Sequence, residues 1–448
     1  MTENDIIPSV TVRDDYVPKE AYTCPEFARR EKQRLWPRVW QVACREEEIP
    51  KVGDYVTYEI CDESFIVVRS TQETIRAFYN VCLHRGRRLT AGVGRAPSFY
   101  CNYHGWRWNL DGTIHSIVDR GDWDGCPSVT DEDFKLKEVQ VDTWGGFVYL
   151  NPDPNAESLA EYLSPMPDFI DPFELETMRY RWYVSVKLPC NWKVALEAFD
   201  EGYHVQATHP QLLMHTGEDI TRSSKHGKHG MFGYFVEGRP WGTPSPRTGK
   251  PVPEDIRPGV IRAFDEYNHT LKAIFTERDT NAARRLMTEM EPTQDGLAVT
   301  QKVLELQKEA AEAEGAGWPG ITMEELGKAG TDWHVFPNQI FLIYPDGALC
   351  YRSRPNGDDP DSCIYDVWSI QRYAPGAEPK LERQYFHGDD DWRGFHNVSI
   401  ILQQDFDNME EVQKGMKSVA FEAARPSPLQ ETAVSNMHRH LHEYLNDQ

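Results

Sequence analysis

Two short segments each place a cysteine close to a histidine. The first is Cys82-Leu-His84 and the second is Cys101-Asn-Tyr-His104, with sixteen residues between His84 and Cys101. A thiolate sulfur and an imidazole nitrogen are both good ligands for transition metals. Two loops that each offer one ligand of each kind can therefore hold a metal site with two sulfur and two nitrogen ligands.

Two kinds of metal site accept this ligand set. Zinc binds two cysteines and two histidines in many structural sites. A Rieske [2Fe–2S] cluster has two cysteines on one iron and two histidines on the other. Zinc sites usually take both cysteines from one loop and both histidines from another, whereas each loop here supplies one of each. This arrangement favours the iron–sulfur cluster, and Gly86 and Gly105 would let the backbone approach it.

A second set of possible ligands lies later in the chain. His204 and His209 are five residues apart in a stretch with helical character. With one carboxylate they would form the 2-His-1-carboxylate triad that holds Fe(II) and leaves positions open for O2 and substrate. The best distant carboxylate is Asp405, with Asp407 and Glu410 as neighbours. Helical spacing puts Asp405 and Asp407 on different faces, so only one can point inward. A pair of histidines at this spacing also occurs by chance. The presence of the two Cys–His loops earlier in the chain strengthens its interpretation as part of an iron site.

The composition narrows the class of protein. The 448 residues carry 48 basic and 71 acidic side chains, a formal net charge of −23. That field would repel nucleic acid, so no nucleic-acid partner is expected. Without an apolar run of about 18 residues or a basic, apolar leader, neither a membrane span nor a secretory signal is expected. Nine thinly spread cysteines argue against a disulfide framework and favour a cytoplasmic location with reduced thiols.

Three regions differ in their hydrophobic pattern. Residues 1–40 are interpreted as an N-terminal arm with a short helix. Residues 41–155 contain short alternating runs between turn signals, which predicts a small all-β domain around the first motif. Residues 156–448 mix strands with helices and are expected to form a second domain. Its expected helical parts are residues 191–208, an insertion over 255–330 and a long amphipathic helix over 398–419.

With these motifs in this order, the chain resembles the large (alpha) subunit of Rieske-type aromatic-ring-hydroxylating oxygenases along nearly its whole length. The similar stretches are residues 40–58, 78–86, 101–112, 145–152, 191–209 and 404–418. Respiratory Rieske proteins carry an additional cysteine in each cluster loop, and Arg87 and Tyr103 occupy those positions here. The resemblance implies an α+β fold, with an N-terminal all-β Rieske domain and a C-terminal helix-grip catalytic domain around a large antiparallel sheet.

The resemblance also implies a role for each candidate residue. The [2Fe–2S] cluster ligands would be Cys82, His84, Cys101 and His104, and the ligands of the catalytic Fe(II) would be His204, His209 and Asp405. The family places a carboxylate three residues before the first iron histidine, where it links the catalytic site to the Rieske histidine of a neighbouring subunit. Glu201 occupies this position, where many members have aspartate, and Asp200 lies beside it. Such a route implies a trimer or hexamer.

The activity implied is that of a terminal oxygenase component. It would activate O2 at Fe(II) with electrons from the cluster and hydroxylate a small aromatic substrate, with ring dihydroxylation as the main expectation. Monooxygenation, including O- or N-demethylation, is the alternative, and a non-catalytic Rieske electron-transfer or ligand-binding protein is a remote one. No G-x-G-x-x-G follows a predicted strand, so NAD(P)H would act through a separate reductase, often with a ferredoxin. The expected assembly is a homotrimer, or a trimer with a small beta subunit.

The substrate site is weakly encoded. Ten side chains could line an apolar pocket, although such spacings more often belong to an ordinary core: Phe199, Tyr203, Met214, Phe232, Phe235, Trp333, His334, Phe336, Phe341 and Tyr344. A basic loop over residues 222–229 follows the iron histidines. It could hold a substrate carboxylate, but a solvated loop is the favoured interpretation.

Overall fold

The chain divides into two compact units. The structure, a computed structural model, describes residues 12–126, 130–217, 220–234, 238–388 and 391–446. The smaller unit is Glu31–Tyr162, and the larger unit combines Leu163 onward with the described residues up to Arg30. The predicted arm over residues 1–40 is therefore not a separate part. Its first portion packs with the larger unit, and the remainder belongs to the smaller one.

The smaller unit is built from β-strands. Its described residues form a seven-stranded sheet and a three-stranded sheet. In spatial order the larger of these sheets contains β2 (Gln41–Arg45), β11 (Phe147–Asn151), β10 (Glu138–Trp144), β5 (Ile75–Tyr79), β4 (Glu63–Arg69), β3 (Asp54–Ile60) and β6 (Val93–Arg95). The other contains β7 (Phe99–Tyr100), β8 (Arg107–Trp108) and β9 (Ile114–Ser116). Strand β3 shows the expected alternation, because Val56, Tyr58 and Ile60 are buried and the residues between them are partly exposed.

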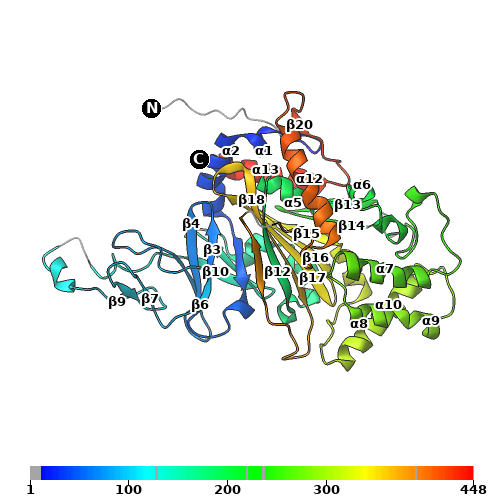
Figure 1. Cartoon of the computed structure of the whole chain (residues 1–448), viewed down its shortest axis with the longest axis horizontal. Coiled ribbons are helices and arrows are strands. Elements are labelled where there is room, and N and C mark those ends of the chain that lie inside the picture. The colour runs from blue at the N-terminus through cyan, green and yellow to red at the C-terminus, as the bar shows by residue number, and fades with distance from the viewer. Residues whose placement is uncertain (1–11, 127–129, 218–219, 235–237, 389–390, 447–448) are drawn as a thin grey trace. The chain divides into compact units, whose positions relative to one another are not determined.

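The larger unit is organised around a mainly antiparallel sheet (Figure 1). Eight strands of the described chain form it, and only the contact between β12 and β19 is parallel. Their spatial order is β13 (Thr221–His226), β14 (His229–Tyr234), β15 (Asp332–Val335), β16 (Gln339–Tyr344), β17 (Gly347–Asn356), β18 (Asp359–Gln371), β12 (Arg179–Leu188) and β19 (Arg383–Phe386). The predicted α+β fold with a large antiparallel sheet is confirmed.

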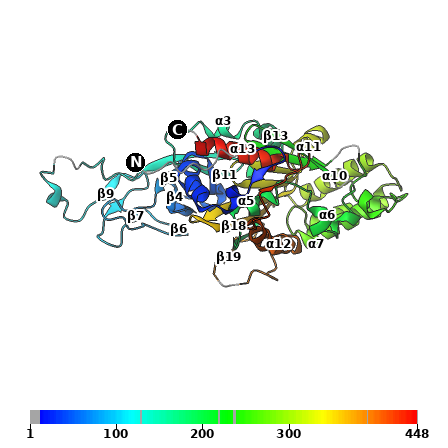
Figure 2. The same ribbon diagram turned by 90° about the horizontal axis from the view of Figure 1, so that it is seen from above.

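Helices supply most of the chain that surrounds this sheet. The described helices are α1 (Glu20–Thr23), α2 (Pro25–Arg30), α3 (Leu159–Leu163), α4 (Pro167–Ile170), α5 (Trp192–Glu197), α6 (Val205–Thr208), α7 (Arg257–Thr270), α8 (Glu277–Arg284), α9 (Leu286–Glu289), α10 (Gly296–Ala313), α11 (Met323–Ala329), α12 (Ile400–Met416) and α13 (Thr432–Asn446). None of the helices in the described ranges is long and apolar enough to cross a membrane. Helices α7 and α10 belong to the segment 255–330 and lie at one end of the larger unit in both views (Figures 1 and 2).

The predicted helix over residues 191–208 is interrupted. Helix α5 ends at Glu197, α6 begins at Val205, and the residues between them are not helical. The Glu201 carboxylate accepts hydrogen bonds from the backbone N–H groups of Tyr203 and His204. A side chain that takes backbone donors in this way competes with the helix and starts a new turn. The interruption therefore comes from Glu201 and lets His204 and His209 flank α6.

A buried hydrogen-bond network joins the N-terminal segment to the core of the larger unit. The Tyr22 hydroxyl donates to Glu197 Oε2 over 2.8 Å and lies 3.1 Å from His438 Nε2. Glu197 Oε1 lies 2.6 Å from the same His438 nitrogen. Burial raises the pKa of Glu197 to about 8 and lowers the pKa of His438 well below its usual value. A protonated Glu197 therefore donates to a neutral His438. Two short strands, β1 (Val17–Pro18) and β20 (Ala423–Ala424), pair beside this network.

Replacing Tyr22 with phenylalanine should destabilise the protein, because buried Glu197 loses a hydrogen-bond donor. The expected cost is roughly 1–3 kcal/mol, visible as a lower midpoint of thermal unfolding. The matched control is Tyr385→Phe, because Tyr385 is 52% exposed. Equal midpoints for the two variants would contradict a stabilising role for the network.

Candidate metal centres and substrate cavity

The two cysteine–histidine loops of the smaller unit have the same backbone hydrogen bonds. In the first loop, the N–H of Gly86 donates to the Cys82 carbonyl over 2.9 Å. In the second, the N–H of Gly105 donates to the Cys101 carbonyl over 3.0 Å. Both glycines have φ of +75°, a conformation that side chains disfavour. The repeated turn brings one cysteine and one histidine to each loop tip.

The ligand atoms of these loops face a common space. The His84 and His104 rings have centroids 4.4 Å apart, and both Nδ1 atoms are buried without a hydrogen-bond partner. Burial raises the pKa of the Cys82 thiol, although the nearby backbone N–H of His84 acts to lower it, whereas at Cys101 the backbone N–H of Tyr103 helps to outweigh burial and the pKa is lowered. N–H donors to sulfur favour the thiolate form that iron binds. Two unpartnered nitrogens and two supported sulfurs fit a Rieske cluster.

An apolar shell covers the cysteine side of this space. Cys82 is 2% exposed, Cys101 is fully buried, and both pack in an apolar cluster with Phe78 and Phe134. The Trp106 ring stacks on His84 with centroids 4.9 Å apart. Burial and hydrogen bonds to sulfur are features by which a protein sets the potential of such a cluster.

The second ligand set converges in the larger unit. His209 Nε2 lies 2.9 Å from Asp405 Oδ1 and 3.3 Å from His204 Nε2. His204 Nε2 is 3.5 Å from the same Asp405 oxygen. The second oxygen, Asp405 Oδ2, is buried without a partner. Two imidazole nitrogens and a carboxylate in this arrangement fit a divalent iron, with Asp405 supplied by α12.

Each histidine of this set is oriented by a side chain behind it. Glu201 Oε1 is 2.7 Å from His204 Nδ1, and Gln404 Oε1 is 2.8 Å from His209 Nδ1. These acceptors place a proton on each Nδ1 and leave both Nε2 atoms free to bind metal. Gln404 carried no assigned role in the sequence, although its position directly before Asp405 was a usable signal.

Electrostatics favour a cation at this point. Burial alone would lower the pKa of His204, but the carboxylates of Glu201 and Asp405 outweigh it and raise the pKa to about 9. The site without metal therefore holds a proton on His204. A bound metal ion would take the place of that positive charge.

The neighbouring acidic residues on α12 point elsewhere. The Asp405 side chain is 3% exposed, whereas that of Asp407 is 54% exposed and pairs with Arg393 over 2.9 Å. Glu410 is likewise exposed and pairs with Lys414. Of the three carboxylates considered from the sequence, only Asp405 reaches the two histidines.

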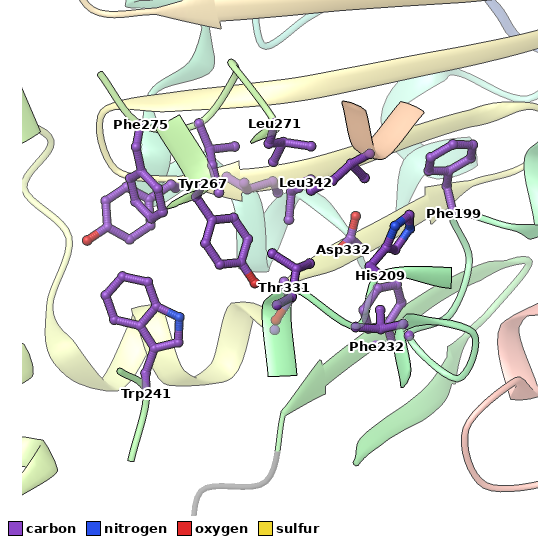
Figure 3. Close-up of a pocket in the computed structure, with 18 of the residues that line it drawn as sticks. Phe199, His209, Phe232, Trp241, Tyr267, Leu271, Phe275, Thr331, Asp332 and Leu342 are labelled. Carbon is purple, nitrogen blue, oxygen red and sulfur yellow. The ribbon is translucent and has the colours of Figure 1, made fainter. Parts of the chain in front are cut away.

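An apolar cavity of about 380 Å³ opens onto these ligands. Of the ten predicted lining residues, Phe199, Phe232 and Tyr344 contribute to it, and Phe235 lies outside the described residues. The other six are not among the residues that line this cavity. Side chains not predicted for the cavity include Trp241, Tyr267, Leu271, Phe275 and Asp332 (Figure 3). Three of these come from the predicted insertion, so helix α7 and the residues after it shape the cavity.

The basic loop does not contribute to this cavity. It forms the β13–β14 hairpin, in which Lys225 pairs with Asp14 over 3.0 Å. The His226 ring packs on Trp333 at 4.8 Å, and His229 Nδ1 accepts the backbone N–H of Phe336. None of these side chains lines the cavity, which favours the interpretation as a structural, partly solvated loop.

Comparison with known families matches each of the two units to a known domain. Residues 175–447 match the model described as the ring hydroxylating alpha subunit (catalytic domain), and residues 39–123 match the Rieske [2Fe-2S] domain. The chain belongs to the ring-hydroxylating alpha-subunit family. The predicted family is therefore confirmed, and each domain of this Rieske oxygenase contains one of the two ligand sets.

Relatives of known activity belong to several branches of this family. The carnitine monooxygenase oxygenase subunit of Escherichia coli (strain K12) is 30% identical over 217 residues, which cover 47% of this chain and 56% of the relative. The glycine betaine monooxygenase oxygenase subunit of Chromohalobacter salexigens is 32% identical, over 45% and 44% of the two chains. The biphenyl 2,3-dioxygenase alpha subunit of Rhodococcus jostii (strain RHA1) is 32% identical, over 46% and 45%. The matched segments span about half the length of these relatives.

Solved structures share the fold over nearly the whole chain. A quaternary ammonium Rieske monooxygenase in complex with L-carnitine has a TM-score of 0.63 at 17% identity, and the match covers 96% of this chain and 97% of that one. A naphthalene 1,2-dioxygenase with bound indole has a TM-score of 0.63 at 20% identity, with 97% and 92% covered.

Replacing Asp405 with alanine should remove the mononuclear ion and leave the cluster in place. Iron per chain should fall from about three to about two, because the cluster holds two irons and the triad one. The cluster's visible absorption should not change. The matched control is Asp407→Ala, two residues further along the same helix, which should keep about three irons. Equal iron contents for the two variants would rule out Asp405 as the selective ligand.

Proposed function

We propose that this Rieske oxygenase is a terminal oxygenase component that inserts one oxygen atom into a C–H bond of its substrate. The observation that carries the proposal is the convergence of His204, His209 and Asp405 at the wall of an apolar cavity. Support for monooxygenation comes from the carnitine and glycine betaine monooxygenase relatives. Ring dihydroxylation, the main expectation from the sequence, has less support than its alternative.

Different residues of the chain would bind the metal groups, orient the histidines and position the substrate in this reaction. When bound, the cluster supplies electrons and the ferrous ion activates O2. Glu201 and Gln404 hold the protons on the Nδ1 atoms of the two histidines, so the Nε2 atoms stay directed at the metal position. The apolar cavity wall positions the substrate and excludes water. In balance, substrate, O2, NAD(P)H and one proton give hydroxylated substrate, water and NAD(P)+.

Electrons would come from partner proteins. The sequence contains no dinucleotide-binding fingerprint after a predicted strand. We therefore propose that a separate NAD(P)H-dependent reductase, alone or with a ferredoxin, reduces the cluster. The assembly proposed is a homotrimer, or a trimer with a small beta subunit.

Glu201 is proposed to couple the two metal sites across a subunit boundary. One of its oxygens is 2.7 Å from His204 Nδ1. A second cavity, of about 400 Å³, is lined by Glu201, His204 and Asp405 together with Glu197 and Glu431. This opening on the ligand set would allow a histidine of a neighbouring subunit to reach the Glu201 carboxylate. The carboxylate would then accept hydrogen bonds from histidines of both sites.

Ring dihydroxylation remains a second candidate for a specific reason. The cavity is lined mainly by apolar and aromatic side chains, among them Phe199, Phe232 and Phe275, and such a surface accepts a flat aromatic ring. The biphenyl 2,3-dioxygenase alpha subunit is also among the relatives.

Turnover under 18O2 separates the two reactions. The holoenzyme with a surrogate reductase should place one labelled oxygen in the product of a methylated amine, or release labelled formaldehyde. A panel of aromatic hydrocarbons and aromatic acids serves as the comparison. Two labelled oxygens in a ring diol, with no product from the amines, would establish dihydroxylation instead.

Mixed oligomers test whether electrons cross between subunits. A Cys101→Ser subunit lacks the cluster and an Asp405→Ala subunit lacks the mononuclear ion, so each should be inactive alone. Coexpressed subunits should recover activity, because the cluster of one serves the iron of another. Adding Glu201→Ala to the iron-bearing subunit should lower that recovery roughly 10- to 100-fold. Mixed oligomers that stay inactive would contradict the inter-subunit route.

A further inference from the structure

Asp332 is a charged residue in the wall of an otherwise mainly apolar cavity. It lies on β15, between Phe232 of β14 and Leu342 of β16, and all three residues line the cavity. It is 7% exposed. Figure 3 shows it on the same side of the cavity as His209 and Phe199, with Trp241 and Phe275 at the other end.

The Asp332 carboxyl group differs from the other carboxylates at this cavity. Glu201 and Asp405 both contact histidines of the metal site. Among the described residues, none donates a hydrogen bond to Asp332 or forms an ion pair with it, and burial is the only cause that raises its pKa above the ordinary value. A carboxylate out of water and without a partner is costly. A ligand in the cavity can supply the missing positive charge.

The rest of the cavity wall restricts which cation would fit. A primary ammonium group needs acceptors for three N–H donors, and a guanidinium group needs acceptors for five. The wall around Asp332 is provided mainly by the apolar side chains of Phe199, Phe232 and Leu342, with Thr331 and His209 as polar neighbours, so it offers few acceptors for such donors. A methylated ammonium has few or no N–H donors, spreads its charge over its methyl groups and binds well against aromatic rings.

The far end of the cavity suits an apolar group. The Trp241 and Phe275 rings have centroids 6.0 Å apart, and Tyr267 lies 6.0 Å from Phe275. Phe275 also packs edge-on against Tyr344 at 4.6 Å. The Trp241 and Phe275 rings lie at the end of the cavity away from Asp332 in Figure 3. Together with Tyr267 and Tyr344 they form a box that would hold an aliphatic or aromatic substituent.

We propose that Asp332 is the specificity-determining residue for a substrate with a methylated ammonium group and an apolar substituent. This inference rests on the proposed oxygenase function and names the substrate class of that site. The carboxylate binds the positive charge close to the iron ligands, and the ring box takes the apolar part. An N-methyl carbon then lies nearest the metal position. The bound cation also favours the ionised form of Asp332, which burial alone disfavours.

The test compares two ligands of the same shape and different charge. Benzyltrimethylammonium is the cation, and neopentylbenzene is its isostere with carbon in place of nitrogen. Calorimetric titration of the anaerobic holoenzyme should show at least about tenfold tighter binding of the cation. Asp332→Asn should lower the affinity for the cation about tenfold or more and leave that for the isostere within about twofold.

Two controls separate charge recognition from damage to the cavity. Thr331→Val alters the neighbouring cavity-lining residue without a change in charge, so it should keep the preference for the cation. Iron content and cluster absorption of Asp332→Asn should match those of the unmodified chain. Equal binding of both ligands by the unmodified chain, or equal losses for both in Asp332→Asn, would overturn the inference.

The same measurement separates this inference from the proposed function. A chain that dihydroxylates neutral arenes and binds both ligands equally would keep the oxygenase assignment and overturn the role of Asp332. A chain that binds the cation through Asp332 but gives no oxygenated product would support the inference on recognition and contradict the proposed reaction.

Discussion

The candidate metal site of the larger unit depends on bringing three possible ligand atoms together from two distant segments. His204 and His209 flank the short helix α6, and Asp405 lies on α12. Their ligand atoms lie within 4.8 Å of one another. That convergence requires α12 to bury one face, which places Asp405 inward. It also requires the helix before His204 to break, which the Glu201 carboxylate brings about by accepting backbone N–H groups.

Hydrogen bonding and charge then give the buried carboxylates separate roles. Glu201 fixes the orientation of His204, while Asp405 would balance the charge of a cation held by the two histidines. Glu197 is partly buried against Tyr22 and His438, where burial favours its protonated form. Asp332 alone among these four lacks a protein partner within the described chain and faces the cavity. The surroundings of each carboxylate thus suit it to a different role: metal binding for Asp405, support of a histidine for Glu201, structural anchoring for Glu197 and the proposed recognition of charge for Asp332.

The segment between β14 and β15 supplies three of the aromatic rings that line the cavity. Trp241, Tyr267 and Phe275 all come from this part of the chain, and their rings contact one another. The sheet and the two histidines with Asp405 line the other end of the cavity. The fold itself is shared with a quaternary ammonium monooxygenase and a naphthalene 1,2-dioxygenase. The substrate that fits would therefore depend both on this segment and on the charge of Asp332 in the sheet.

The sequence by itself determined the features that depend on local spacing. The two Cys–His loops, the glycines behind them and the alternation of β3 follow from neighbours a few residues apart. Helical spacing also required Asp405 and Asp407 to face different ways, but the structure decided which of them is buried. Only the tertiary structure decided the break before His204, the packing of residues 12–30 on the larger unit and the setting of Asp332. Those features arise when side chains far apart in the chain share one buried space, because burial and the absence or presence of a partner then set their chemistry.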